Sequence, residues 1–181
     1  MVRDFPRDEL RPLPRIRKYF RENRYVGFGG YDETGYLLCY AMFYAFDYVT
    51  NKKKRQRVCL FDYLAVTEKY RDTGIGSEFL QYLKRSFPGS DIVFSEVENA
   101  DYAEDALERR TRERRMEFYL RNGLQDTAVT ARVWNVEYRI LEMPHGDHWD
   151  PHTQEEIREA CEQVYHSVFP PAIYDHYVLV R

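Results

Sequence analysis

The stretch that decides the fold runs from residue 66 to residue 77 and reads Val-Thr-Glu-Lys-Tyr-Arg-Asp-Thr-Gly-Ile-Gly-Ser. An apolar segment, residues 58–66, leads into it, and a segment with the apolar spacing of a helix, residues 74–87, follows. Gly74 and Gly76 allow a tight turn and close approach to a ligand, because neither has a Cβ atom. The free N–H groups of the first helical turn would then form an anion site that suits a pyrophosphate.

Two other kinds of phosphate-binding loop fit this stretch less well. A P-loop requires Gly-Lys-Ser/Thr, whereas Gly76 is followed by Ser77 and Glu78. The dinucleotide fingerprint requires a third glycine where Phe79 stands. A plain strand-to-helix turn is the alternative for the two glycines alone. The strand before them and Arg71, three residues before the first glycine, favour a ligand-binding turn.

Residues 71–76, Arg-Asp-Thr-Gly-Ile-Gly, resemble the Arg/Gln-x-x-Gly-x-Gly/Ala motif of the GNAT (Gcn5-related N-acetyltransferase) superfamily. A second segment, residues 117–124, reads Glu-Phe-Tyr-Leu-Arg-Asn-Gly-Leu and is similar to the family's Phe-Tyr-x-x-x-Gly-Phe segment. The expected order of strands and helices between about residues 15 and 141 is also the family order. The resemblance therefore covers most of the chain and depends on two separate motifs.

The resemblance implies an α/β (α+β) fold with a mixed, mostly antiparallel sheet flanked by helices. Its two central parallel strands, residues 58–66 and 91–97, would splay apart to admit acetyl-CoA. We expect one domain, residues 1–181, with a core of about residues 15–142 and a C-terminal helical extension, residues 143–181. The other expected strands are residues 24–31, 36–48, 124–132 and 133–142. The expected helices are residues 14–23, 74–87 (ended by Pro88-Gly89), 103–122 and one from Thr153 to Pro170-Pro171.

The resemblance implies that acetyl-CoA is the cofactor and that it acts as a co-substrate. The backbone of Leu64 and Val66 would hold its thioester and pantetheine, and the N–H groups of residues 72–77 would cradle its pyrophosphate. Asn99, just after the second parallel strand, would meet the pantetheine or acetyl group, although it stands 20 residues before Tyr119, more than twice the usual spacing. The residues expected to bind acetyl-CoA are Leu64, Val66, Arg71, Asp72, Thr73, Gly74, Ile75, Gly76, Ser77 and Asn99.

Tyr119 is the expected general acid, because the family's tyrosine at this place can protonate the leaving thiolate. The alternative is that Tyr119 only lines the CoA channel. An amine acceptor must also lose a proton before it attacks, and a carboxylate can take it. Glu96 and Asp62 are equal candidates for this base, and Glu98 ranks below them. Strand alternation predicts that Asp62 shares a face with Leu64 and Val66.

Charge and cysteine content restrict the partners and the setting. The chain has 181 residues with 27 basic and 30 acidic side chains, a net charge of −3, so nucleic acid is not an expected partner. Three cysteines without CxxC spacing favour a reduced, cytoplasmic setting. No apolar run approaches the length of a membrane span, so no membrane contact is expected. Residues 109–115, rich in arginine, are charged all round and predict a helix segment that projects into solvent.

The segment 145–152, His-Gly-Asp-His-Trp-Asp-Pro-His, has side chains that could bind zinc. Its Gly146 and Pro151 fit an irregular turn, and no cysteine is near, so we expect a loop without metal. The acceptor would be a small-molecule amine or a peptide, and the chain a monomer or a homodimer.

The function expected first is an acetyl-CoA-dependent N-acetyltransferase with direct attack in a ternary complex. A non-catalytic CoA-binding sensor or interaction module is the alternative. The family's first strand and helix have no counterpart in this sequence, either because they are absent or because the chain is truncated, and about 40 residues follow the last expected strand. Those residues would fill the missing wall or build a dimer contact. A binder of nucleic acid through residues 52–57 and the arginine-rich run is the third possibility, and the negative net charge disfavours it.

Overall fold

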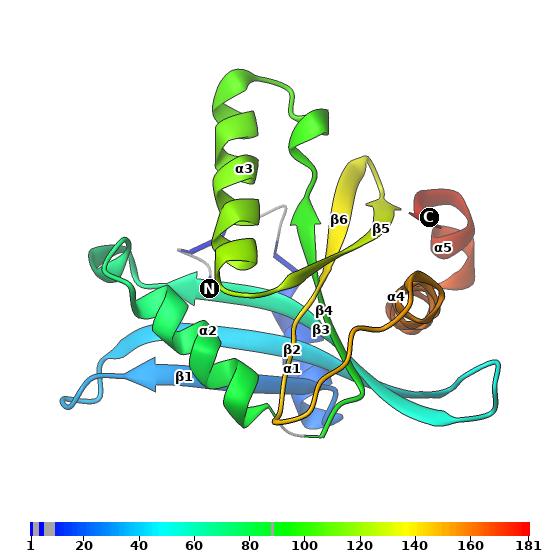
Figure 1. Ribbon diagram of the computed structural model, residues 1–181, viewed down its shortest axis with the longest axis horizontal. Coiled ribbons are helices and arrows are strands. Elements are labelled where there is room, and N and C mark those ends of the chain that lie inside the picture. Colours follow the sequence, from blue (N-terminus) through cyan, green and yellow to red (C-terminus); the bar gives the residue numbers. More distant parts are fainter. Residues whose placement is uncertain (2–3, 6–9, 88) are drawn as a thin grey trace.

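A seven-stranded sheet runs through the protein, and helices cover both of its faces (Figure 1). The computed structural model describes residues 1, 4–5, 10–87 and 89–181. The strand order is β1-β2-β3-β4-β6-β5-β7, and β3 and β4 form a parallel pair while the other neighbours are antiparallel. The strands are β1 (Tyr25–Tyr31), β2 (Leu37–Val49), β3 (Arg55–Val66), β4 (Ile92–Glu98), β5 (Gln125–Val133), β6 (Val136–Glu142) and β7 (Val178–Val180). The helices are α1 (Leu13–Arg21), η1 (Glu68–Tyr70), α2 (Ile75–Ser86), η2 (Ala100–Tyr102), α3 (Ala106–Arg121), α4 (Gln154–Val168) and α5 (Pro171–Tyr177).

The mixed, mostly antiparallel sheet confirms the expected fold class. Local chemistry explains why its first hairpin forms. Asp32 Oδ1 accepts the N–H groups of Thr34 and Tyr36 at 2.9 Å each, and Gly35 takes the positive φ of +83° that the turn needs. The predicted stop of α2 at Pro88-Gly89 falls partly on Pro88, which lies outside the described residues. Among the described residues, no helix is both long and apolar enough to cross a membrane.

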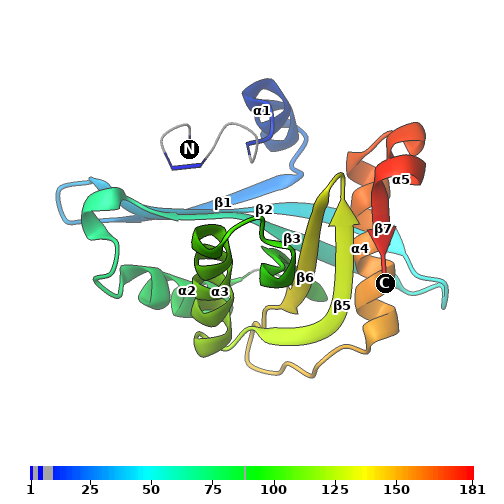
Figure 2. The same ribbon diagram turned by 90° about the horizontal axis from the view of Figure 1, so that it is seen from above.

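Two apolar clusters lie on opposite faces of the sheet. One contains side chains of α1 and α4, such as Ile16 and Ile157, and the other contains side chains of α2 and partly buried ones of α3, such as Leu80 and Phe118. Figure 2 shows α1 on one side of β1–β3 and α2 and α3 on the other. We call these the α1/α4 face and the α2/α3 face.

The C-terminal extension packs onto the α1/α4 face. Thr153 and Glu156 form the predicted capping box at the start of α4, and Ile157, Cys161 and Val164 are buried as predicted. Beyond it, α5 and β7 were not predicted from the sequence. β7 pairs with the end of β5, with Ala131 opposite Val180, so a short strand closes this edge of the sheet.

The parallel strands separate as the resemblance implies. β3 and β4 pair only over Val58–Phe61 and Ile92–Ser95. Beyond these residues β3 stays with β2 as far as Val66, while β4 stays with β6 as far as Glu98. The two strand ends therefore follow different neighbours, and Figure 1 shows β4 crossing the direction of β3.

A β-bulge in β3 corrects the expected position of Asp62. On β2, Met42 is opposite Tyr63 and Phe43 is opposite Phe61, which leaves Asp62 without a partner. The extra residue breaks the alternation, so Asp62 joins Tyr63 on the α1/α4 face. Leu64 and Val66 pack on the α2/α3 face. The prediction that Asp62 shares their face was wrong.

The arginine-rich part of α3 is also less exposed than expected. Arg112 is only 7% exposed. Its Nη1 donates to the carbonyl oxygen of Asn99 at 3.0 Å, and its Nη2 donates to Glu108 at 2.8 Å. This charged segment therefore contains one buried arginine, which ties α3 to the turn after β4, because a long side chain can bury its stem while its head is paired.

Replacing Ile157 by alanine tests whether the extension is an integral part of the folded unit. Ile157 is fully buried. Its truncation should lower the free energy of unfolding by about 2–4 kcal/mol, measured by urea denaturation. The control is Leu179→Ala in β7, whose side chain is 38% exposed and should cost about 1 kcal/mol or less. A separate early transition for α4, or no loss in Ile157→Ala, would contradict the packing described.

Candidate functional site

The turn between β3 and α2 has the backbone geometry of an anion site. Gly74 precedes α2 with a φ of +93°, a conformation that suits glycine. The N–H groups of Ser77 and Glu78 bond the Gly74 carbonyl at 2.9 and 3.1 Å. The N–H groups of Ile75 and Gly76 lie in the first turn, where no helix carbonyl is available to them. The turn therefore directs free N–H groups and the positive end of the helix dipole to one place.

Three further predicted residues shape this turn. A Cβ atom on Gly76 would lie 3.3 Å from Val66 Cγ2 and 3.5 Å from the Phe118 ring, so glycine allows α2 to begin close to β3 and α3. Asp72 has a φ of +60°, which bends the chain before Gly74. The Thr73 hydroxyl donates to the Tyr70 carbonyl at 2.7 Å, which fixes the turn from within.

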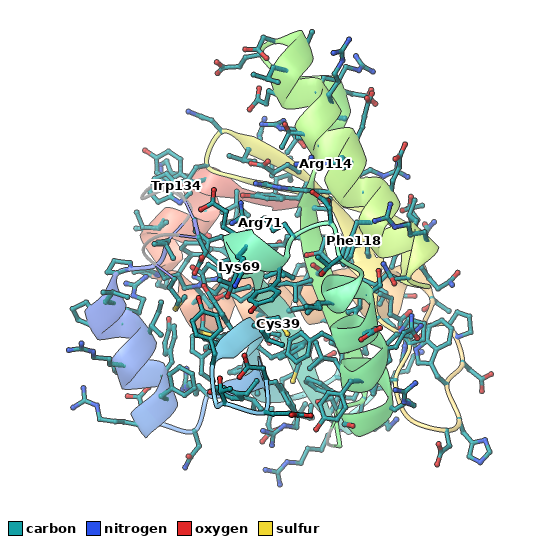
Figure 3. The ribbon with its side chains drawn as sticks, turned by 90° about the vertical axis from the view of Figure 1, so that its left-hand side faces the viewer. Cys39, Lys69, Arg71, Arg114, Phe118 and Trp134 are labelled. Carbon is teal, nitrogen blue, oxygen red and sulfur yellow. The ribbon has the colours of Figure 1, made fainter. Side chains whose placement is uncertain are left out.

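The backbone of Leu64 and Val66 faces the space between the separated strands. The Thr67 N–H group donates to Leu38 of β2 at 2.8 Å. Since successive residues of a strand direct their backbone groups to opposite edges, Val66 and Leu64 direct theirs away from β2. The Nε atom of Arg71 reaches the Val66 carbonyl from this side at 3.2 Å. Figure 3 looks onto this end of the sheet, with Lys69 and Arg71 labelled beside Phe118 and Arg114 of α3.

Tyr119 lies where β3 and β4 begin to separate. Its ring is 6.2 Å from that of Phe61, and Ser95 lies close enough to its hydroxyl group to lower its pKa against the larger effect of burial. Phe61 and Ser95 are the last paired residues of the two strands. Burial raises the pKa of Tyr119 to about 12, so the hydroxyl group stays protonated at neutral pH. It can therefore donate a hydrogen bond to an anion that develops at this point.

Asp62 forms a buried ion pair on the opposite face. Its carboxylate accepts from Arg11 Nε at 2.9 Å and Nη2 at 3.3 Å, and also from the Tyr25 hydroxyl group. The side chains of Arg11 and Asp62 are 18% and 8% exposed. The backbone N–H of Arg11 donates to the Tyr63 hydroxyl oxygen at 2.9 Å. Asp62 accepts three hydrogen bonds, and these hold the segment before α1 against the sheet.

Glu96 lies on the same face and has a different environment. The hydroxyl group of Tyr165, from α4, donates to its Oε1 atom. Burial raises the pKa of Glu96 above its ordinary value, while this hydrogen bond and the nearby Arg11 oppose the rise. A carboxylate with one tyrosine donor and a raised pKa is a better proton acceptor near neutral pH than one held by an arginine fork.

Glu98 and Asn99 are engaged in local structure. Glu98 pairs with Arg112 at 3.5 Å and with Arg115 at 3.2 Å. The Asn99 Oδ1 atom accepts the N–H group of Asp101 at 3.1 Å and caps η2. Both side chains therefore stabilise the turn at the base of α3, and the predicted contact of Asn99 with the pantetheine stays a prediction.

Four residues of the site were missed by sequence reasoning: Arg11, Tyr25, Ser95 and Tyr165. The sequence contained one usable signal among them. Tyr165 continues the buried stripe of Ile157 and Cys161 at steps of four. Its hydroxyl group is therefore expected to have a hydrogen-bond partner inside the protein. Nothing local indicates that Arg11 lies beside Asp62, 51 positions away.

The histidine-containing loop forms a polar cluster around Glu142. Trp149 Nε1 donates to Glu142 Oε1 at 3.2 Å, and the His152 ring bonds the same carboxylate, which raises the pKa of His152. Within the described ranges, no group of three or more His, Cys, Asp or Glu side chains is arranged to hold a metal ion.

Comparisons with protein-family models and with curated protein sequences found no match. Solved structures do resemble this one. Arabidopsis thaliana NAA60 in complex with acetyl-CoA is 12% identical, with 74% of this chain and 83% of that chain covered and a TM-score of 0.49. The ribosomal-protein-S18-alanine N-acetyltransferase of Escherichia coli is 16% identical, with 75% and 80% covered and a TM-score of 0.43. The IAA acetyltransferase from Bacillus cereus is 13% identical, with 73% and 84% covered and a TM-score of 0.47.

The fold itself is defined by the chain's own strands. The mostly antiparallel sheet, the single parallel pair that separates after Phe61 and Ser95, and the glycine turn into α2 make up the GNAT-type fold that the sequence motifs imply.

Removing Arg11 tests the buried ion pair. Arg11→Met should lower the free energy of unfolding by about 3–5 kcal/mol at pH 7, because it leaves the Asp62 carboxylate buried without its cation. The double variant Arg11→Met, Asp62→Asn should recover a large part of that loss. Arg17→Met, at an exposed position of α1, is the control and should change stability by about 0.5 kcal/mol or less. Equal effects of Arg11→Met and Arg17→Met in urea denaturation would contradict the pairing.

Proposed function

We propose that this chain is an N-acetyltransferase of the GNAT superfamily that moves the acetyl group of acetyl-CoA to an amine. The observation that carries the proposal is the position of three groups around the separated ends of β3 and β4. The turn at Gly74 and Gly76 lies on the α2/α3 face, Tyr119 lies at the base of the separation, and Glu96 lies on the α1/α4 face. Such an arrangement suits a donor that enters from one face and an acceptor that enters from the other.

Acetyl-CoA would bind along the free edge of β3. The free N–H groups of the turn, among them those of Ile75 and Gly76, would hold its pyrophosphate, and the backbone groups of Leu64 and Val66 would pair with its extended pantetheine arm. The acetyl carbonyl would then lie between the strand ends, close to Tyr119. Arg71, which now bonds the Val66 carbonyl, would be free to move to a phosphate when that edge is occupied.

The reaction would proceed by direct attack in a ternary complex. Glu96 accepts a proton from the acceptor ammonium, and the neutral amine nitrogen attacks the thioester carbonyl. The carbon–sulfur bond breaks as the Tyr119 hydroxyl group gives its proton to the leaving sulfur. The attacking nitrogen loses its second proton to the Tyr119 oxygen, and Glu96 releases its proton to solvent. The products are the acetylated amine and CoA. Glu96 is preferred to Asp62 as the base because Arg11 and Tyr25 already occupy the Asp62 oxygens.

The acceptor would be a small-molecule amine or a peptide, and the setting the cytoplasm. Cys39, Cys59 and Cys161 are free and buried, which agrees with a reducing compartment. We further propose that residues 1–181 act as one domain in which α4 supplies Tyr165 to the acceptor side.

Binding and turnover of acetyl-CoA test the proposal directly. Thermal shift should show stabilisation by acetyl-CoA, and a thiol-release assay over a panel of amines should show turnover. Stabilisation without turnover for any amine would support a non-catalytic CoA-binding module instead. Absence of binding to any short acyl-CoA would remove the proposal altogether.

Replacing Tyr119 by phenylalanine tests its role as the acid. Tyr119→Phe should lower kcat by roughly 100-fold, because the leaving thiolate loses its donor, and should change the Kd for acetyl-CoA little. Tyr102→Phe is the matched control, since Tyr102 is 56% exposed and should retain full activity. A parallel loss of kcat and of acetyl-CoA affinity would assign Tyr119 to binding.

The pH profile tests Glu96 and its partner Tyr165. Because a base must be deprotonated, kcat/KM should fall as the pH drops through the raised pKa of Glu96. Tyr165→Phe removes a donor that stabilises the carboxylate, so the pKa rises further and the acid limb moves to higher pH. Tyr177→Phe, in the same extension but exposed, should leave the limb in place. An acid limb that is identical in Tyr165→Phe and wild type would remove Glu96 as the base.

A further inference from the structure

The segment that contains α1 carries a strong positive charge in a chain whose net charge is −3. Between residues 11 and 24 there is one acidic side chain, Glu22. The basic side chains of this segment are Arg11, Arg15, Arg17, Lys18, Arg21 and Arg24. Arg11 is used in the ion pair with Asp62, and most of the others are exposed. This concentration of charge is not explained by the proposed function.

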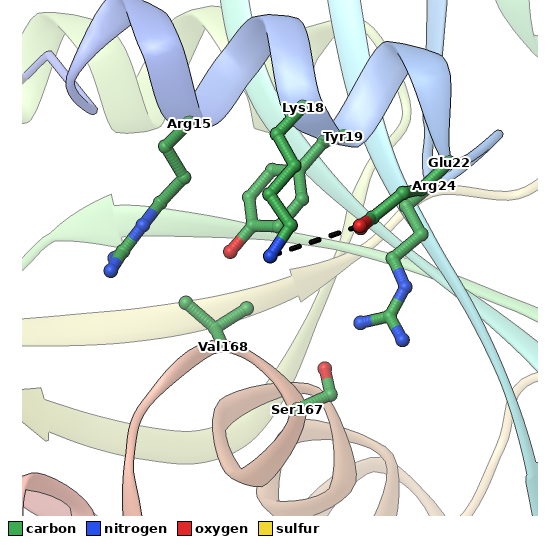
Figure 4. Close-up of a pocket in the computed structure, with 7 residues that line it drawn as sticks. All are labelled: Arg15, Lys18, Tyr19, Glu22, Arg24, Ser167 and Val168. Carbon is green, nitrogen blue, oxygen red and sulfur yellow. Dashed lines mark ion pairs between the residues drawn. The ribbon is translucent and has the colours of Figure 1, made fainter.

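A pocket between α1 and α4 collects part of this charge. Its lining residues are Arg15, Lys18, Tyr19, Glu22, Arg24, Ser167 and Val168. Figure 4 shows Arg15, Lys18 and Tyr19 extending from α1 toward α4, with the Arg24 guanidinium group directed to the same space. The one acidic lining residue, Glu22, is 3.7 Å from Lys18. Arg15 and Arg24 are therefore left without an ion-pair partner among the lining residues.

The position of Arg24 is fixed by a chain of hydrogen bonds. Its Nη1 donates to the Tyr44 hydroxyl oxygen at 3.0 Å, and the Tyr44 and Ser167 hydroxyl groups are 3.1 Å apart. Ser167 donates to the Val164 carbonyl at 2.6 Å, so Tyr44 donates to Ser167. Tyr44 is fully buried. One N–H group of the guanidinium anchors it to this buried chain, which holds the charged head in place before any ligand arrives.

We propose that this pocket binds an anionic group, either a carboxylate or a phosphate. Arginine forks match the oxygens of both groups, and a second cation from the same helix adds to the attraction. The pocket contributes two arginines and a lysine against one glutamate, together with the hydroxyl groups of Tyr19 and Ser167. A cation would meet repulsion from three side chains in the same space.

The pocket lies on the same face as the proposed acceptor side. Tyr19, which lines it, packs against Tyr25 with ring centres 5.5 Å apart. The hydroxyl group of Tyr25 in turn bonds Asp62. The anion could thus come from two sources: an anionic end of the acceptor itself or a separate anion that regulates the enzyme. This choice between sources rests on the proposed function, whereas the anion site itself does not.

Titration with inorganic phosphate tests the site without any enzymatic reaction. We expect saturable binding at low ionic strength, followed by backbone amide shifts in NMR spectra at α1 and the end of α4. Arg15→Gln should weaken binding by about threefold or more, because one cation of the site is lost. Glu22→Gln should strengthen it. Arg17→Gln is the matched control, since it removes the same charge from the same helix outside the pocket lining.

Equal weakening by Arg15→Gln and Arg17→Gln, or shifts spread over the whole surface, would overturn the site. Arg24→Gln breaks the bond to Tyr44 and carries a risk of misfolding, so Arg24→Lys serves as a second variant. Lysine keeps the charge but lacks the fork, and we expect weaker phosphate binding with an unchanged melting temperature. Wild-type phosphate affinity in both Arg15→Gln and Arg24→Lys would also overturn the proposal.

Acetylation kinetics then distinguish the two sources. A free amino acid and its amide form a pair of amines that differ by one carboxylate. If the acceptor supplies the anion, Arg15→Gln raises KM for the amino acid and not for the amide, and phosphate competes with the amino acid. If the anion is a separate regulator, phosphate changes the turnover of both amines alike. A protein that binds phosphate but never acetylates any amine would disprove the proposed function and leave the anion site standing.

Discussion

The end of the parallel pairing between β3 and β4 is the constraint on which the rest of the structure depends. Pairing stops at Phe61 and Ser95 because the two strands then follow β2 and β6 in different directions. The separation leaves a free strand edge at Leu64 and Val66 and places Tyr119 at its base. Strand edges elsewhere in a sheet are normally covered or blunted, so an unpaired edge inside a fold is a natural place for an extended ligand.

The two faces of the sheet contribute different chemistry to that separation. On the α2/α3 face the glycine turn presents backbone N–H groups, which suit a phosphate. On the α1/α4 face a buried ion pair, Arg11 with Asp62, and a tyrosine–carboxylate pair, Tyr165 with Glu96, lie close together. The second pair joins residues 69 positions apart and depends on the packing of α4. The C-terminal extension thus shapes the proposed acceptor side as well as the core.

Local signals in the sequence were sufficient for much of this arrangement. The turn at Gly74 and the capping box at Thr153 were predicted because short-range backbone preferences determine them. The strand separation was predicted only through the family resemblance that the two motifs carry. The face of Asp62 was predicted wrongly, since a one-residue bulge opposite Met42 and Phe43 leaves no mark in the alternation of apolar residues. The position of Arg11 beside Asp62 and the burial of Arg112 depend on contacts between distant segments. Local patterns in a single sequence do not predict such contacts.

A crystal structure of the protein with acetyl-CoA tests the central claim most directly. The account predicts the pyrophosphate at the free N–H groups of the turn that contains Gly74 and Gly76, the pantetheine along the free edge of β3, and the sulfur atom within hydrogen-bonding reach of the Tyr119 hydroxyl group. It also predicts that the acetyl carbon faces Glu96. Acetyl-CoA bound elsewhere on the molecule, or a sulfur atom remote from Tyr119 with β3 and β4 closed on each other, would contradict it.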